Sequence, residues 1–286
     1  MPSTPLPDRA DRSLGERLCR TALTTVADHL EPVMSLYKPY VEGVEHLPAD
    51  GRFLIVGNHT QMSAAEIVLI PYCVRQAIGS QVRPLADRQF GKMRGLQADL
   101  IAAYGAVVGS PESATTLMQQ DATILVFPGG GREIGKFKGE EYKLRWDNRY
   151  GFARLAAEHH YPIVTAALVG GDDVYTSLTT RDSLYGRASG WLGERLGGRP
   201  DMAMPLVRGI GPTLIPQPRR MYLRFGAPIS SIEPAGTPPD TWVTELKEKV
   251  QAQLEFDLQD LQRVRRNDPY RALNPLARHL AATPHG

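Results

Sequence analysis

The stretch ATILVFPGGGRE (residues 122–133) gives the first indication of the architecture. Its first half, ATILVF (122–127), is an almost continuous apolar run, which is typical of a strand buried on both faces. A second such run, PIVTAALV, covers residues 162–169, and apolar residues at helical spacing lie between the two. Strands that alternate with helices predict a single α/β domain, with a mostly parallel central sheet flanked by helices.

The alternation continues on both sides of this stretch. Ser110, Pro111 and Glu112 form a typical helix start, with an N-cap, a proline at the first helical position and an early acid. A helix is also expected from about Ser63, and apolar residues at helical spacing predict a C-terminal helix over residues 242–261. Further strands are expected in four segments: residues 40–47, 53–56, 106–108 and 221–226.

The domain organisation follows from changes in composition. We find no boundary that divides residues 38–272, so this range is expected to form one domain. Residues 1–12 are rich in Pro, Asp and Arg and are expected to be disordered. Residues 13–37 are predicted to form an amphipathic helix, which either packs on the domain or lies on a membrane surface. Residues 273–286 are a C-terminal tail, preceded by an arginine-rich segment.

Composition excludes several classes of protein. The 286 residues carry a formal charge of only +2, which argues against nucleic acid as a partner. Cys19 and Cys73 provide neither a disulfide framework nor the spacing of zinc ligands, so a reducing compartment such as the cytoplasm is expected. The N-terminus lacks the apolar segment of a signal peptide, and no window is apolar enough to span a bilayer.

A histidine follows the strand predicted at residues 53–56. Histidine can take a proton near neutral pH, and it does so best when a carboxylate fixes its tautomer. His59 has Glu66 as its nearest downstream acid. Ser63 and Glu66 fit the S-x-x-E capping box, which would turn the glutamate back toward the helix start and toward His59. The same pattern allows a simpler interpretation, in which Glu66 only caps the helix.

Three glycines follow the strand predicted at residues 122–127. Gly129, Gly130 and Gly131 allow close approach of a ligand, and their N–H groups could hold an anion or a developing oxyanion. The alternative is a glycine turn with a solvated charged loop. No metal-ligand or nucleophile-elbow motif occurs, and Phe137 replaces the hydroxyl that a P-loop requires. Four cations follow the glycines and are candidates for binding phosphates: Arg132, Lys136, Lys138 and Lys143.

With both motifs in place, the chain resembles the glycerolipid acyltransferase superfamily, whose signature is an Asn-His with a downstream acid followed by F-P-E-G-T-R. It is most similar to the branch that contains diacylglycerol acyltransferase-like proteins and phytyl ester synthases. The resemblance covers residues 38–272 and rests on the following segments: Asn58-His59, FPGGGRE, GEEYKLRW, GFARLAAEHHYPIVTAALVGGDD, YLRFGAPI and DPYR.

The resemblance implies a role for each motif. His59 would be the base that deprotonates an acceptor hydroxyl, and Glu66 would be its acid partner. The turn from Gly129 to Gly131, with Arg132, would lie at an acyl thioester and at the phosphates of its carrier. The donor would be acyl-CoA or acyl carrier protein, and no cofactor is implied. The remaining residues assigned to substrate binding are Asn58, Phe127, Pro128, Lys136, Lys138 and Lys143.

Departures from the family pattern indicate the acceptor. Ala64 stands where the commonest spacing has an aspartate, and Gly129 replaces the family's glutamate. The segment around Gly105 lacks the arginine of members that accept phosphorylated substrates, which favours a neutral lipid alcohol or acylglycerol. Three alternatives stay open: a non-catalytic module that binds lipid or acyl-CoA, a lysophospholipid acyltransferase, and an esterase.

A peripheral location at the inner face of the membrane is expected, because an acyl substrate requires access from a membrane. One loop-rich region contributes apolar residues that either line a lipid entrance or merely pack: Trp191, Met202, Met204, Leu206, Ile210, Leu214 and Ile215.

Overall fold

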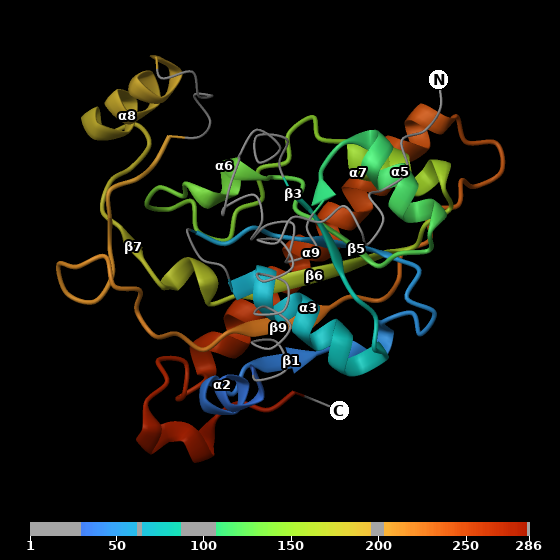
Figure 1. Ribbon diagram of the computed structural model, residues 1–286. Helices are drawn as coiled ribbons and strands as arrows, with labels where there is room; N and C mark the ends of the chain where they lie inside the picture. Colours follow the sequence, from blue (N-terminus) through green and yellow to red (C-terminus); the bar gives the residue numbers. More distant parts are fainter. Residues whose placement is uncertain (1–29, 62–64, 87–106, 196–202, 285–286) are drawn as a thin grey trace, which may run out of the picture.

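A computed structural model describes residues 30–61, 65–86, 107–195 and 203–284. The described residues form a seven-stranded sheet in the order β1-β9-β6-β2-β5-β3-β4 (Figure 1). A second, two-stranded sheet pairs β7 (Thr176–Ser177) with β8 (Val207–Arg208). The strands of the main sheet are β1 (Tyr40–Glu42), β2 (Leu54–Gly57), β3 (Arg83–Ala86), β4 (Val107–Val108), β5 (Ile124–Val126), β6 (Ile163–Val169) and β9 (Tyr222–Phe225).

The sheet is mostly parallel, as predicted. Strand β2 lies at its centre and pairs in parallel with β5 on one side and β6 on the other. The exceptions are β1 and β9, which run parallel to each other and opposite to the other strands, since β9 pairs with β6 in the antiparallel direction. Because β2 and β5 are parallel neighbours, the segments that follow them leave the sheet at the same edge.

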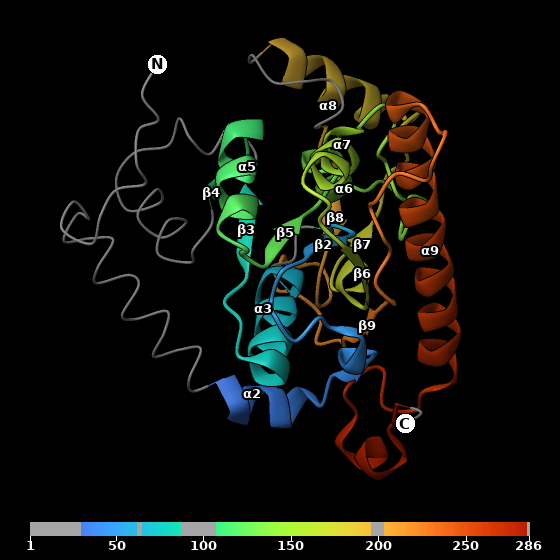
Figure 2. The same ribbon diagram turned by 90° about the vertical axis from the view of Figure 1, so that its right-hand side faces the viewer.

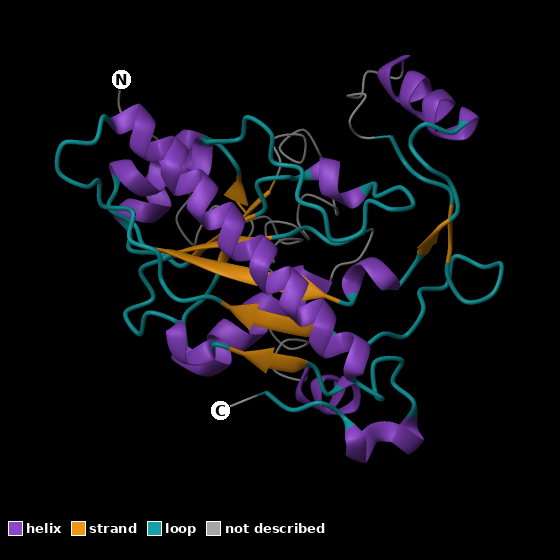
Figure 3. Cartoon of the chain, turned by 180° about the vertical axis from the view of Figure 1, so that it is seen from behind, coloured by secondary structure: helices purple, strands orange, loops and turns teal. Residues whose placement is uncertain are grey.

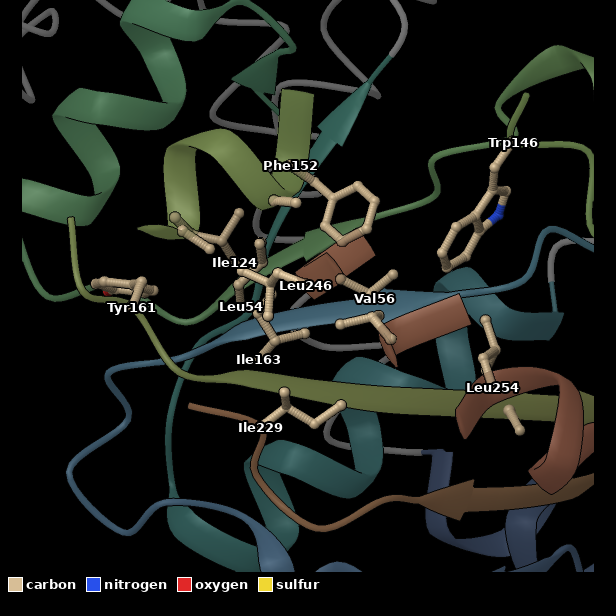
Figure 4. Close-up of a cluster of buried hydrophobic side chains, with 14 of the residues drawn as sticks. Leu54, Val56, Ile124, Trp146, Phe152, Tyr161, Ile163, Ile229, Leu246 and Leu254 are labelled. Carbon is tan, nitrogen blue, oxygen red and sulfur yellow. The ribbon is translucent and has the colours of Figure 1, made fainter. Parts of the chain in front are cut away.

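Helices cover both faces of the sheet (Figure 2). Alternate residues of β2 point to opposite faces, so Leu54 and Val56 join the apolar cluster under α5, α7 and α9, whereas Ile55 joins the cluster under α3. Figure 4 shows the first cluster, which includes Leu54 and Val56 of β2 and Leu246 of α9. The helices are α2 (Leu30–Tyr37), α3 (Ala65–Ile78), α5 (Pro111–Gln119), α6 (Gly131–Ile134), α7 (Gly151–Glu158), α8 (Leu184–Arg195) and α9 (Pro239–Asn267), with 3-10 turns η1 (Val44–His46), η3 (Gly171–Asp173) and η5 (Pro275–Leu280).

Several predicted elements are confirmed and others need correction. The apolar runs at 122–127 and 162–169 contain β5 and β6, and Ser110 caps α5 by accepting a hydrogen bond from the Ser113 N–H. The strand expected over residues 40–47 ends at Glu42, because Gly43 adopts φ 77° and η1 follows. Strand β3 and helix α8 were not predicted.

The C-terminal part of the chain is more ordered than a tail. The helix predicted over residues 242–261 extends to Asn267, so Arg263, Arg265 and Arg266 are helical residues. Helix α9 crosses the strands on one side of the molecule (Figure 3). Beyond it, Ala282 donates its N–H to Asp268 and accepts a hydrogen bond from Arg220, which attaches residues near the C-terminus to the domain. Residues 1–12, predicted to be disordered, residues 13–29 of the predicted amphipathic helix, and Ser63, predicted to cap a helix, lie outside the described residues. None of the helices described is long and apolar enough to cross a bilayer.

Candidate active site

Two motifs that lie 70 residues apart in the sequence meet at one edge of the sheet. Asn58 and His59 follow β2, and Phe127 to Gly131 follow the adjacent strand β5. Loops at the carboxyl ends of parallel strands are a common place for ligand and active sites. Direct contacts join the two segments, since His59 touches both the ring of Phe127 and the carboxyl group of Glu133.

Asn58 fixes the position of the histidine through the sheet. Its side chain is buried, with Nδ2 donating to the carbonyl of Leu168 at 3.0 Å and Oδ1 accepting from the Leu168 N–H at 2.8 Å. These two bonds continue the pairing of β2 with β6 beyond the last strand residue. Asn58 was assigned to substrate binding, and the structure shows both polar ends of its side chain engaged by β6.

His59 and Glu66 form a close pair. The Nδ1 atom of His59 lies 2.6 Å from Oε1 of Glu66, and the side chains are 14% and 0% exposed. Glu66 also accepts hydrogen bonds from the Thr60 N–H at 3.0 Å and the Thr60 hydroxyl at 2.5 Å. The seven-residue separation is bridged because the chain turns between β2 and α3, which places Glu66 in the first turn of α3.

The environment of Glu66 favours its ionised form. Burial acts to raise the pKa of this carboxyl, but the hydrogen bond and charge of His59 and the two hydrogen bonds from Thr60 outweigh burial, so the pKa lies below its usual value. An ionised Glu66 can only accept a hydrogen bond, so the Nδ1–H group of His59 is the donor in this contact. Nε2, on the opposite side of the ring, is then the atom with a lone pair that can take a proton.

Phe127 supports the imidazole ring. The two rings stack with centroids 4.6 Å apart and an interplanar angle of 25°. Phe127 in turn lies against Gly57, where an added Cβ would come within 3.1 Å of the phenyl ring. Phe127 was assigned to substrate binding from the sequence. The structure adds that its ring restricts the orientation of His59.

Glu133 explains why residue 129 is glycine. A Cβ at Gly129 would lie 2.2 Å from the carboxyl carbon of Glu133, so this carboxylate fills the space that a side chain at residue 129 would need. Glu133 is buried and accepts hydrogen bonds from the N–H groups of His59 at 2.8 Å and Arg145 at 2.9 Å. Burial raises its pKa against the opposing effects of Lys136 and these two bonds. Sequence reasoning missed Glu133, although it belongs to the FPGGGRE motif.

Lys136 is an internal cation. Its side chain is buried, with Nζ 2.7 Å from Asp172 Oδ2 and donating to the carbonyl of His59 at 2.8 Å. Asp172 accepts further hydrogen bonds from the N–H groups of Gln61 and Tyr142, both at 2.7 Å. Lys136 was predicted to bind a substrate phosphate, and the structure instead shows its charge neutralised inside the protein.

The segment after the glycine turn thus holds His59 by both of its peptide groups, with Glu133 at the N–H and Lys136 at the carbonyl. The Gly130 N–H donates to Phe127 at 3.0 Å, which makes it part of the turn. Three of the predicted cations are partly or fully exposed: Arg132, which pairs with Asp147 at 2.5 Å, and Lys138 and Lys143. These three stay candidates for contact with a phosphate. Among the residues described, no group of His, Cys, Asp and Glu is arranged to hold a metal ion.

Comparison with known proteins identifies the domain around this site. Residues 38–169 match the family model named Acyltransferase, and this range contains His59, Glu66 and the glycine turn. Residues 38–169 are thus similar to the acyltransferase family. Asp172, which pairs with Lys136, lies just beyond the range that the acyltransferase model covers.

Relatives of this chain include an uncharacterized Mycobacterium tuberculosis protein, 29% identical over 82% of this chain and 64% of the relative. Phytyl ester synthase 2 of Arabidopsis thaliana is 30% identical over 86% of this chain and 37% of the plant protein. The chain therefore spans less than two thirds of either relative. A solved structure, the 1-acyl-sn-glycerophosphate acyltransferase of Thermotoga maritima, aligns with a TM-score of 0.43 and 15% identity over 90% of this chain and 84% of that one.

Proposed function

We propose that this protein is an O-acyltransferase that moves a fatty acyl group from a thioester, on acyl-CoA or acyl carrier protein, to a neutral lipid alcohol or acylglycerol. The observation that carries the proposal is the 2.6 Å contact between His59 and Glu66 beside the glycine turn. The match of residues 38–169 to the acyltransferase family model supports acyl transfer as the class of reaction. The similarity to a protein named phytyl ester synthase supports an alcohol as acceptor.

The proposed reaction is a direct transfer. Nε2 of His59 takes the proton of the acceptor hydroxyl as its oxygen attacks the thioester carbonyl. The tetrahedral intermediate then collapses, the carbon–sulfur bond breaks, and the thiolate leaves with the proton that His59 carries. The products are an ester and a free thiol. Glu66 acts as a positioning residue that fixes the tautomer of His59 and stabilises the imidazolium. The aspartate of a Ser-His-Asp triad has the same role.

We assign the glycine turn to the developing oxyanion, and Arg132, Lys138 and Lys143 to the phosphates of the carrier. Gly129, Gly130, Gly131 and Pro128 supply the turn, and Phe127 supports the base. We further place the protein at the cytoplasmic side of a membrane, attached to its surface, because both the acyl donor and the acceptor carry long apolar chains.

The test is an assay with radiolabelled acyl-CoA and a panel of alcohols and acylglycerols, in which free thiol and lipid products are both followed. We expect a new ester and an equal amount of thiol from the native protein. His59→Ala is expected to lose activity by a factor of about 100 or more. His279→Ala, which removes an exposed histidine of η5, is the matched control and is expected to retain full activity. Unchanged turnover by His59→Ala would refute the mechanism.

The same assay distinguishes the alternatives. An esterase would release free fatty acid without a new ester. A non-catalytic lipid carrier would bind acyl-CoA stoichiometrically and release no thiol. With lysophosphatidate added to the panel, a lysophospholipid acyltransferase would prefer it over the neutral acceptors.

A further inference from the structure

An apolar surface lies outside the candidate active site. It belongs to a region that we call the arm, residues 176–195 and 203–219, which comprises β7, α8, β8 and the loop after β8. Ten of the seventeen large hydrophobic side chains that are exposed in the described residues belong to the arm, although it is a small part of the chain. The most exposed are Leu184 (84%), Leu214 (69%), Ile215 (59%) and Trp191 (56%). Exposed apolar side chains in such numbers indicate an interaction surface.

The arm is held in place by specific hydrogen bonds. The Leu178 N–H donates to the carbonyl of Leu206 at 2.8 Å, next to the pairing of β7 with β8. The Ser189 hydroxyl of α8 donates to the Met204 carbonyl at 3.0 Å and accepts from the Met204 N–H at 3.2 Å. Figures 1 and 3 show α8 standing apart from the body of the sheet. The apolar side chains are therefore presented to solvent by a folded region.

The charge of the arm favours a membrane over a protein partner. The arm carries five arginines but only Asp182 and Glu194 as acids, whereas the whole chain is almost balanced. The guanidinium of Arg195 lies 5.0 Å from the ring centroid of Trp191, so the most exposed aromatic ring of the arm is paired with a cation. Arg208 and Arg219 line an open hollow at the base of the arm. Cores of protein interfaces are depleted in charge, whereas surfaces that bind anionic bilayers combine apolar side chains with Lys and Arg.

The arm is attached to both motifs of the candidate active site. The Ser177 hydroxyl donates to the carbonyl of Lys136 at 2.6 Å and accepts from the side-chain amide of Gln61 at 2.6 Å. Arg181 pairs with Glu140 at 2.7 Å and donates to the carbonyl of Gly135 at 3.2 Å. Whatever the arm binds is thereby fixed in orientation relative to the loop that follows His59.

We propose that the arm binds the surface of an anionic lipid bilayer, with Leu184, Trp191, Leu214 and Ile215 inserted among the lipids and with Arg187, Arg195 and Arg208 at the phosphates. This proposal deepens the proposed function, since it names the surface from which an acyl chain reaches His59. Binding itself is independent of turnover, so the two proposals are tested separately.

Tryptophan fluorescence provides the first test. Trp146 and Trp242 are already buried at 1% and 8% exposure, so only Trp191 changes its environment on insertion into a bilayer. Vesicles of phosphatidylglycerol and phosphatidylcholine are expected to shift the emission of the full chain to shorter wavelength, with a smaller effect at high salt. Pure phosphatidylcholine vesicles should bind more weakly. The Trp191→Phe substitution should abolish the shift in emission. The variant protein should still sediment with the anionic vesicles.

A charge placed on the arm provides the second test. Leu184→Asp combined with Leu214→Asp is expected to weaken sedimentation with anionic vesicles by about tenfold or more, because two side chains can no longer be buried in lipid. The control is Ile232→Asp, which alters a comparably exposed side chain (62%) outside the arm and should have little effect. A second control, Leu36→Asp with Leu276→Asp, alters exposed residues of α2 and η5.

The outcomes separate the possibilities. Loss of vesicle binding in the α2 and η5 variant but not in the arm variant would overturn the proposal, as would absence of a shift from Trp191. A change of oligomeric state in the arm variant, without a change in vesicle binding, would identify a second copy as the partner and would also overturn it. The arm variant should keep its turnover of a short-chain thioester with a water-soluble alcohol. His59→Ala should lose that turnover and still bind vesicles, so failure of the one proposal is distinct from failure of the other.

Discussion

Replacement of Asp172 by alanine should destabilise the protein strongly. The carboxylate is fully buried and pairs with the equally buried ammonium of Lys136 at 2.7 Å. It also accepts hydrogen bonds from the N–H groups of Gln61 and Tyr142. Asp172→Ala leaves a buried cation without its counter-ion and removes the acceptor of two N–H groups.

The expected magnitude follows from these contacts. Removal of one partner of a buried ion pair costs about 3–5 kcal/mol. The two N–H groups would each cost about 1–3 kcal/mol if they found no new acceptor. Since such effects overlap, the lower bound is about 3 kcal/mol. At about 2–4 °C per kcal/mol for a chain of this size, the melting temperature should fall by at least about 6 °C.

The measurement is the free energy of unfolding in urea, followed by far-UV circular dichroism, together with the melting temperature. The matched control is Asp121→Ala, which removes a surface ion pair with Arg52 of similar length, 2.9 Å, whose carboxylate is 70% exposed. That loss should stay below about 1 kcal/mol. A double variant, Lys136→Met with Asp172→Leu, should recover much of the stability, since it removes both charges together.

The result that refutes this reasoning is a loss in Asp172→Ala no larger than that in Asp121→Ala, because burial of the pair would then have no energetic consequence. The double variant separates stability from activity. It should fold but should still turn over slowly, because the bond from Lys136 to the carbonyl of His59 is missing.

Three further predictions concern the neighbours of His59. Because the pKa of Glu66 is lowered in the folded state, its contribution to stability is present above its usual value of 4.5 and is lost as pH falls below that value. The free energy of unfolding in urea should therefore fall less between neutral pH and about pH 3 in Glu66→Gln than in the native chain. Parallel curves of this free energy against pH would contradict the pairing. Gly129→Ala should lower the free energy of unfolding by about 1–3 kcal/mol through the clash with Glu133. In a double-mutant cycle with Glu133→Ala, the double variant should lose less stability than the sum of the two single losses, and an additive cycle would exclude the clash. Phe127→Leu removes the stacking on His59, worth about 0.5–1.5 kcal/mol, and should lower kcat with little change in KM; an equal change in both would place Phe127 at the substrate instead.

The sequence predicted the elements whose apolar pattern is unambiguous. Strands β5 and β6 are buried between helices, so their runs of apolar residues are continuous. Strand β3 has the sequence RPLA, whose arginine and proline interrupt such a pattern. Helix α8 escaped prediction because Leu184 and Trp191 face solvent and do not form a buried stripe.

For the candidate site, spacing and residue type predicted that Glu66 would turn back toward His59, and the structure places the two side chains in contact at 2.6 Å. Spacing and residue type did not reveal that Lys136 is neutralised by Asp172, 36 residues later, or that Asn58 is bonded to β6. A lysine or an asparagine in a motif looks the same in a sequence whether it faces a ligand or the interior. Only the fold brings the two partners together and decides between these interpretations.

The carboxylate of Glu133 lies where the side chain of residue 129 would otherwise be. An alignment of this chain with F-P-E-G-T-R sequences would therefore count a lost acid at residue 129, although the carboxyl group of Glu133 fills the space beside that residue. Whether an acid lies near the turn is read from positions in space and not from a single alignment column.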